Sequence, residues 1–317
     1  MKQALTGLAV SALGVTSVLA DDQKGFEFLA FGDMPYGGSQ INYLEQAAKK
    51  LKASDIPFAL FFGDMKSGGK RCSEKRYEEN LSAIFSITEK PVFLTLGDND
   101  WTDCDRKGDN ELAKLYEIRE RAYRSDYLPE NRTTMNINRD TSYPELVRFQ
   151  YQNLYVTTQH IVGTGNGREE VVANNKNEIL IAVDLRDAKN KAWLEESFHA
   201  AAEADGMVVF IHADVTEDSS FLGKEACGSG LQENCDPYAS FIQNLKEKAA
   251  AYEKPVLLIH GSTKVHCVQQ GFLSEDNLTR FNGAGDGVLD LSFVKWNGKT
   301  GFEFKSFNTG KNVKACD

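Results

Sequence analysis

Residues 90–104 read "KPVFLTLGDNDWTDC" and place an apolar run directly before a cluster of acidic and amide side chains. The apolar run is rich in β-forming residues and predicts a buried strand. The polar cluster should therefore lie on the loop at the carboxyl end of that strand. Its members are Asp98, Asn99, Asp100 and Asp103. A solvated turn has a similar composition, so the rest of the sequence must show whether these carboxylates form a site.

Two earlier segments repeat this pattern of a strand followed by glycine and aspartate. The run "GFEFLAFGD" ends at Asp33, and "IPFALFFGD" ends at Asp64. Two later apolar runs end in histidine instead, "MVVFIH" at His212 and "KPVLLIH" at His260. Because strand ends converge on one edge in layered α/β folds, we expect these potential metal ligands to lie close together.

Segments with helical spacing alternate with the predicted strands. They cover residues 40–54, 73–88, 110–125, 179–204 and 238–252. The polar stretch 126–178 contains two further predicted strands, at 146–151 and 154–163. The tail, 288–307, predicts a closing hairpin around Asn297-Gly298. This alternation predicts an α/β fold with helices outside a central sheet.

The first twenty residues have the pattern of a secretory signal. Lys2 precedes an apolar core, and Val18-Leu19-Ala20 provides small residues for cleavage before Asp21. No later segment approaches the ~18 apolar residues that a membrane span needs. We therefore expect residues 21–317 to form a single domain that is secreted or periplasmic and does not span a membrane.

Six cysteines fit an oxidising compartment, because their number is even and none forms a CxxC pair. Composition alone leaves all the possible pairings open. Cys72 and Cys104 follow the second and third acidic loops, so a bridge between them would join those loops. Adjacency and elimination then favour Cys227–Cys235 and Cys267–Cys316.

The formal net charge of −10 argues against nucleic acid as a partner. A phosphate ligand would need local cations, either metal ions or a few placed Lys and Arg side chains. Three carboxylates at one sheet edge repel each other unless a cation lies among them. A mixed oxygen and nitrogen donor set suits a divalent or mixed-valence transition metal such as Mn, Fe or Zn, as one or two ions. Two ions about 3.5–4 Å apart can polarise a phosphoryl oxygen and activate a water molecule.

Five short motifs, in this order, resemble the calcineurin-like metallophosphoesterase superfamily. They are "GDMPYG" (32–37), "GDMKSGG" (63–69), "GDNDWTDC" (97–104), "HAD" (212–214) and "HGSTK" (260–264). They are most similar to an exported subgroup with GDxPY, GDxKSG and GDNEWTDC motifs, and the resemblance covers about residues 26–266. It implies a four-layer α/β/β/α sandwich and hydrolysis of a small phosphate ester by a metal-activated water.

The resemblance also implies roles for individual residues. Asp33 would hold one metal, Asp64 would bridge two, and Lys66 would face the phosphate. Asn99 stands where the superfamily has its catalytic histidine. We therefore predict two sets of site residues. The candidate metal ligands are Asp33, Asp64, Asp98, His212 and His260, and the candidate catalytic residues are Asn99, Asp100 and Lys66.

Several ligand positions of the superfamily are replaced in this sequence. Pro35 stands in place of a histidine, and the adjacent Tyr36 offers an oxygen instead. In the last motif, Ser262 and Lys264 take two ligand positions, and an ammonium group cannot coordinate a metal. Lys264 could instead replace the charge of one ion.

Three hypotheses follow from these replacements. The chain is a working phosphoesterase, a catalytically impaired pseudoenzyme that binds a phosphate-like ligand or a protein, or an exported structural protein.

The "GTGNG" stretch (163–167) resembles a phosphate-binding glycine loop but has no helix directly after it. We interpret it as a loop near the edge that carries the site.

Overall fold

The first three predicted β–α units form one side of the molecule in this computed structural model, which describes residues 25–124, 126–128, 135–228 and 231–316. The expected signal segment, residues 1–20, lies outside the described residues. The strands and helices of these units are β1 (Phe26–Phe31), α1 (Gly38–Leu51), β2 (Ala59–Phe61), α2 (Glu74–Phe85), β3 (Val92–Leu94) and α3 (Glu111–Ala122). The three strands are parallel, and β11 (Ser292–Trp296) and β12 (Phe302–Ser306) extend the sheet in the order β12-β11-β1-β2-β3.

The second sheet has the order β13-β9-β10-β8-β7-β6-β5-β4. Its strands are β4 (Ile137–Arg139), β5 (Val147–Tyr151), β6 (Leu154–Thr158), β7 (Gly206–Phe210), β8 (Val256–His260), β9 (Cys267–Gln269), β10 (Leu278–Asn282) and β13 (Lys314–Ala315). The four central strands, β6, β7, β8 and β10, are parallel to one another. The carboxyl ends of β7 and β8 therefore lie at one edge of this sheet.

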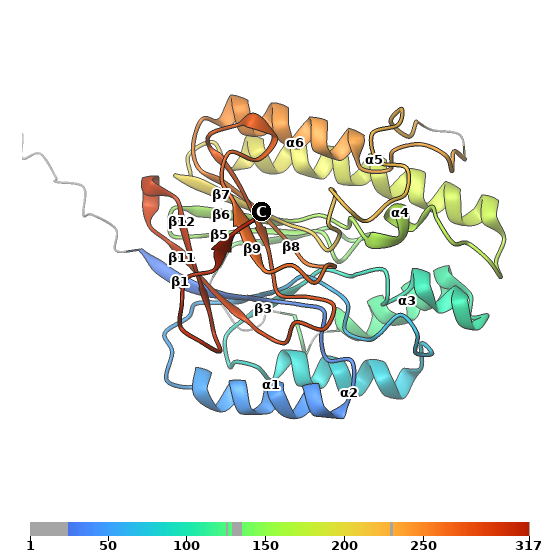
Figure 1. Cartoon of the computed structure of the whole chain (residues 1–317), viewed down its shortest axis with the longest axis horizontal. Helices are drawn as coiled ribbons and strands as arrows, with labels where there is room; N and C mark the ends of the chain where they lie inside the picture. Colours follow the sequence, from blue (N-terminus) through green and yellow to red (C-terminus); the bar gives the residue numbers. More distant parts are fainter. Residues whose placement is uncertain (1–24, 125, 129–134, 229–230, 317) are drawn as a thin grey trace, which may run out of the picture.

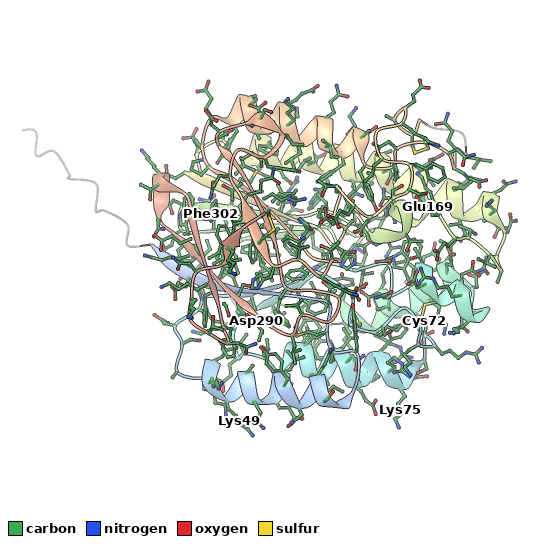
Figure 2. All side chains as sticks on the ribbon, in the orientation of Figure 1. Lys49, Cys72, Lys75, Glu169, Asp290 and Phe302 are labelled. Atoms are coloured by element: carbon green, nitrogen blue, oxygen red, sulfur yellow. A yellow bond between two sulfur atoms is a disulfide. The ribbon has the colours of Figure 1, made fainter. Side chains whose placement is uncertain are left out.

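Helices cover the outer face of each sheet, and the two sheets pack against each other (Figure 1). α1 and α2 lie below the first sheet in this view, with α3 to the right of the sheet, and α5 (Lys176–Ala200) and α6 (Ala239–Tyr252) lie above the second. The helices present one apolar face inward. In α1, for example, Leu44, Ala47 and Leu51 are buried, whereas Lys49 projects outward (Figure 2). The expected four-layer α/β/β/α sandwich is confirmed.

An aromatic cluster fills the space between the two sheets. Phe58 is fully buried, stacks on Phe28 at 5.0 Å, and meets Phe149 of the opposite sheet edge-on at 5.2 Å. Phe149 in turn stacks on Phe93 at 3.9 Å. These rings join strands from both sheets, so they fix how the sheets face each other.

Three disulfides close the chain at separate places: Cys72–Cys104, Cys227–Cys235 and Cys267–Cys316. These are the pairs that the sequence order favours. The last of them joins β9 to the segment after β13, so it holds the carboxyl-terminal end against the second sheet.

Among the described residues, no helix has both the length and the apolar character needed to cross a lipid bilayer.

The sequence analysis missed the short strands β4, β9, β10 and β13. β10 illustrates the reason, because it reads "LTRFN" and places Arg280 and Asn282 in a buried strand. Both polar side chains donate hydrogen bonds to Asp214, which lies on a different segment. Because Asp214 is distant in the sequence, the residues around β10 form no local pattern that would predict this strand.

Phe58→Ala should destabilise the protein by about 3–5 kcal/mol, because it removes a buried ring that contacts both sheets. Chemical denaturation followed by circular dichroism would measure the change in the free energy of unfolding. Tyr116→Ala provides the matched control, since the Tyr116 side chain is 64% exposed and should change stability by less than about 0.5 kcal/mol. Equal effects of the two variants would contradict the packing role given to Phe58.

Candidate metal centre

Asp33 and Asp64 leave their strands through the same backbone conformation. Their φ angles are +52° and +59°, in the left-handed region that aspartate tolerates better than most residues. Each residue follows a glycine, and each turns its carboxylate toward the gap between the sheet edges. Gly97 has to be a glycine here, because a Cβ atom at that position would collide with the Asp64 carboxylate.

His212 meets these carboxylates from the second sheet. Asp33, Asp64 and His212 offer ligand atoms that all lie within 4.8 Å of one another, and all three residues are buried. The His212 Nε2 atom lies 3.4 Å from Asp64 Oδ1 and 3.0 Å from Asp98 Oδ1. The structure therefore brings together four of the five predicted metal ligands.

The two nitrogens of the His212 ring have different surroundings. Nδ1 lies 2.9 Å from the carbonyl oxygen of Phe62, to which it donates a hydrogen bond. Nε2 is buried, faces the carboxylates, and has no hydrogen-bond partner of good geometry. A backbone carbonyl on one nitrogen and an open second nitrogen is the usual arrangement of a metal-binding histidine.

Two effects set the pKa values in this cluster: burial of the side chains and the charges of their neighbours. Burial raises the pKa of Asp33 to about 6 and the pKa of Asp64 well above its usual value. Burial acts against protonation of His212, but the charges of Asp64, Asp98 and Asp33 together raise its pKa well above the ordinary value. A proton on His212 and a metal ion thus balance the same negative charge.

Asp98 is enclosed by the GTGNG stretch, which forms α4 (Gly163–Gly167). The Thr164 hydroxyl donates to Asp98 Oδ2 at 2.8 Å, while Oδ1 faces His212. Burial would raise the pKa of Asp98, but the close contact with His212, the charge of His212 and the Thr164 hydroxyl lower the pKa below its usual value. Thr164 itself has a φ of +54°, which costs a non-glycine residue roughly 1–2 kcal/mol.

Asn99 and Tyr36 complete the cluster beside Asp64. The Asn99 backbone amide donates to Asp64 Oδ1 at 3.0 Å, and its side-chain amide donates to Oδ2. The Tyr36 hydroxyl lies 3.3 Å from Asp33 Oδ1 and 3.4 Å from Asp64 Oδ2, so it bridges the two carboxylates. Burial and the charges of these carboxylates raise the pKa of Tyr36, which keeps the hydroxyl protonated.

Asp100 does not face the cluster as a free carboxylate. Its Oδ2 accepts hydrogen bonds from the backbone amides of Asp64 (3.0 Å) and Gly97 (2.8 Å), and its Oδ1 accepts from Met65 (2.8 Å). The side chain is fully buried. This geometry differs from the catalytic role predicted for Asp100, since its oxygens fasten the second acidic loop to the third.

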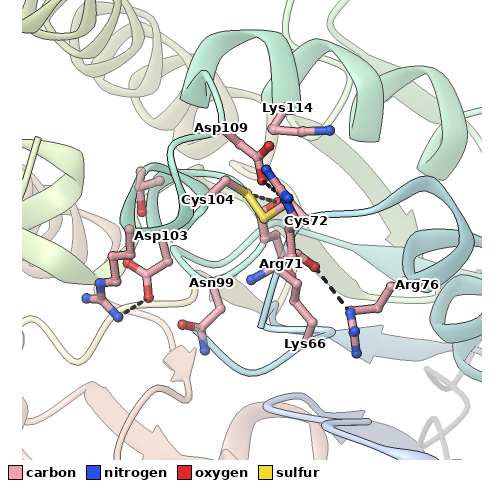
Figure 3. Close-up of a disulfide and its surroundings, with 12 residues drawn as sticks. Lys66, Arg71, Cys72, Arg76, Asn99, Asp103, Cys104, Asp109 and Lys114 are labelled. Carbon is pink, nitrogen blue, oxygen red and sulfur yellow. Dashed lines mark hydrogen bonds and ion pairs between the residues drawn. A yellow bond between two sulfur atoms is a disulfide. The ribbon is translucent and has the colours of Figure 1, made fainter. Parts of the chain in front are cut away.

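Lys66 is also further from solvent than the sequence analysis expects. It is 1% exposed, and its Nζ donates to the Ser67 carbonyl at 3.2 Å. Burial lowers its pKa, although Asp100 and Asp64 act in the opposite direction. Figure 3 shows Lys66 and Asn99 beside the Cys72–Cys104 disulfide, which links the two loops that carry them. Lys66 is therefore an internal side chain and does not line an open surface.

The last motif supplies no ligand side chain to the group of Asp33, Asp64 and His212. Ser262 contributes its backbone amide, which donates to Asp33 Oδ2 at 3.0 Å. Lys264 points away, with a side chain that is 76% exposed and an Nζ 3.8 Å from Asp286. The hypothesis that Lys264 replaces the charge of an ion is therefore wrong.

His260 lies outside the group as well. It is buried, its Nδ1 lies 3.0 Å from the Gly261 carbonyl, and burial lowers its pKa to about 4. In β8 the neighbouring Ile259 faces the space between the sheets, so His260 faces the opposite side of the sheet. His212, at the end of β7, lies on the inner side with Phe210.

Two residues near the cluster were missed by the sequence analysis. Thr164 was assigned only to a loop near the edge. Asp218 hydrogen-bonds to Ser262, and burial together with the charge of Asp98 raises its pKa to about 7. Neither residue belongs to a strand-end motif, so only the folded chain shows that they lie here.

The donor set fits one transition-metal ion. It combines carboxylate oxygens with an open imidazole nitrogen, and burial makes the uncompensated charges costly. Among the described residues, Asp33, Asp64 and His212 form the one group of this kind.

Comparisons with known proteins bear on the fold. No protein-family model and no curated protein matches this sequence. Solved structures are similar to it, including the following two. GAP50, the anchor in the inner membrane complex of Plasmodium, is 11% identical, with 93% of this chain and 90% of that chain covered and a TM-score of 0.51. A dimetal phosphatase from Danio rerio is 10% identical, with 89% and 99% covered and a TM-score of 0.50. This chain therefore shares its fold with a dimetal phosphatase and with a membrane-complex anchor.

Proposed function

We propose that this protein is an exported metal-dependent phosphoesterase with one principal metal ion. The observation that carries the proposal is the meeting of Asp33, Asp64 and His212 at the facing edges of two sheets. The shared fold with a dimetal phosphatase supports a phosphate ester as the substrate. Three disulfides support an oxidising compartment and therefore export.

Asp33, Asp64, His212 and Asp98 would hold the ion. Such an ion acts as a Lewis acid toward a phosphoryl oxygen. The Asn99 side chain holds the Asp64 carboxylate and lies at the partly exposed side of the cluster, so it is our candidate for contact with the substrate. The Tyr36 hydroxyl fixes the separation of Asp33 and Asp64 and stays a hydrogen-bond donor at neutral pH.

The second candidate is a metal-binding relative with little or no catalysis. The orientation of Lys264 and the backbone role of Ser262 favour it, because the segment 261–264 offers no ligand side chain for a second ion. A phosphoesterase that depends on two ions would be impaired by that loss. The two candidates predict the same metal content and different turnover.

Purified protein should contain about one equivalent of Mn, Fe or Zn by elemental analysis and should hydrolyse p-nitrophenyl phosphate. Chelation should abolish hydrolysis, and adding back the metal should restore it. His212→Gln should lower metal affinity and kcat/KM by at least about 100-fold, because it removes the nitrogen ligand.

Lys264→Ala is the matched control, and its metal content and kcat/KM should equal those of the wild type. Metal binding without turnover of any phosphate ester would select the second candidate. Protein that binds no metal would contradict both.

Two substitutions distinguish the structural role of Asp100 from the metal-binding role of Asp64. They are Asp100→Asn and Asp64→Asn, each measured in metal-free protein. Asp100→Asn removes one acceptor from a carboxylate that serves three buried amides, so unfolding free energy should fall by about 1–3 kcal/mol. Burial raises the pKa of both Asp64 and Asp100, so the ionised form of each disfavours folding at neutral pH. Within the described part of the chain, Asp64 accepts a hydrogen bond from only one backbone amide, that of Asn99, so Asp64→Asn should leave stability unchanged or higher. Urea denaturation at pH 7 in the presence of a chelator would measure both. A larger loss for Asp64→Asn than for Asp100→Asn would contradict these roles.

A further inference from the structure

A strained left-handed turn, residues 164–167, encloses Asp98. Thr164, Gly165 and Asn166 have consecutive φ angles of +54°, +59° and +56°, and Gly167 continues at +77°. Glycine adopts this left-handed conformation freely and asparagine tolerates it, but it is unfavourable for a β-branched residue. Of these four residues, Thr164 is therefore the one whose side chain is least compatible with the backbone conformation.

The Thr164 side chain makes polar contacts at the metal centre. Its hydroxyl donates to Asp98 Oδ2 at 2.8 Å and lies 3.3 Å from Asp103 Oδ1. With Oδ2 engaged, the Asp98 carboxylate presents Oδ1 to His212 Nε2 at 3.0 Å. That Oδ1 atom is buried and lacks a hydrogen-bond partner of good geometry.

The backbone of the same turn closes the other side of Asp98. A Cβ atom built on Gly163 would lie 2.8 Å from Asp98 Oδ1 and 2.9 Å from its Cγ. The carboxylate thus has little room to rotate between Gly163, the Thr164 hydroxyl and His212.

The far end of the turn is anchored in the second layer of helices. The Asn166 side chain donates to Asp187 Oδ1 of α5 at 2.9 Å, and its oxygen accepts from Arg186 at 2.7 Å. The Asn166 backbone amide donates to the Tyr238 hydroxyl at 3.0 Å. These buried contacts hold the turn rigid, so the position of the Thr164 hydroxyl is fixed by the fold.

We propose that Thr164 is a positioning residue of the metal centre, which orients the Asp98 carboxylate so that Oδ1 faces the ion. The proposal rests on the proposed function in one respect, namely that a metal binds at this centre. Outer contacts of this kind typically change metal affinity by about 10- to 100-fold.

The test measures Mn²⁺ binding by calorimetry on the full protein, independently of activity. Thr164→Val keeps the branched shape and loses the hydroxyl, so its Kd for Mn²⁺ should rise about 10- to 100-fold. Thr164→Ser keeps the hydroxyl and should stay within about threefold of the wild type. Thr300→Val, at an exposed threonine of the last hairpin, is the matched control and should match the wild type.

Two further variants distinguish positioning from a merely structural role. Thr164→Gly relieves the left-handed strain, so the melting temperature of the metal-free protein should equal or exceed that of the wild type while Mn²⁺ binding weakens as in Thr164→Val. Gly163→Ala should weaken Mn²⁺ binding by a different route, because the added methyl group displaces Asp98.

The proposal is overturned if Thr164→Val binds Mn²⁺ like the wild type, or if Thr164→Ser is as weak as Thr164→Val. If the wild type binds no metal, the proposed function fails and the Thr164 proposal is judged on the metal-free protein. The ¹⁵N chemical shift of His212 Nε2 should then move in Thr164→Val and return in Thr164→Ser. A shift that does not move would overturn the proposal.

Discussion

The repulsion among three clustered carboxylates governs how this molecule is built around its centre. Asp33, Asp64 and Asp98 come from three neighbouring strands of one sheet, and His212 of the other sheet is the positive partner they share. Charges this close and this buried disfavour folding unless a proton or a metal ion compensates them. Hydrogen bonds and a disulfide around the cluster hold the carboxylates in place against that repulsion.

Specific contacts hold each of the three acidic loops in place. Asp100 fastens the second loop to the third through three backbone amides, and the Cys72–Cys104 disulfide joins the same two loops covalently. The first loop is held by the Ser262 amide and by the Tyr36 hydroxyl. Asp98 is enclosed by a left-handed turn. The donor set is therefore preorganised, and little conformational freedom remains to be lost when a ligand binds.

The two sides of the centre differ in what they offer. His212 brings an imidazole nitrogen, whereas the segment 261–264 brings only a backbone amide and directs Lys264 to solvent. A fold shared by a phosphatase and by a membrane-complex anchor does not by itself decide between catalysis and binding. The side chains of this centre bear on the number of ions, and they favour one well-held ion over two.

Local sequence patterns were enough to predict the class of fold and most of the cluster. Apolar runs that end in Gly-Asp, alternating with helical segments, predicted an α/β fold with helices outside a central sheet, and the family resemblance of the motifs implied that there are two sheets. The convergence of strand ends predicted that Asp33, Asp64, Asp98 and His212 would meet. Periodicity and strand polarity are local properties, so the order of residues is enough to reveal them.

The direction in which each polar side chain points depends on the packing of the folded chain. His260 and His212 end adjacent parallel strands, yet the pleat sends them to opposite faces of the sheet. Asp100 resembles its acidic neighbours in sequence, but the amides that it binds belong to two different loops. Thr164 gained its role from a hydroxyl 2.8 Å from a carboxylate 66 residues earlier in the chain. Contacts between segments so far apart leave no trace in local sequence, because they depend on how the two sheets pack.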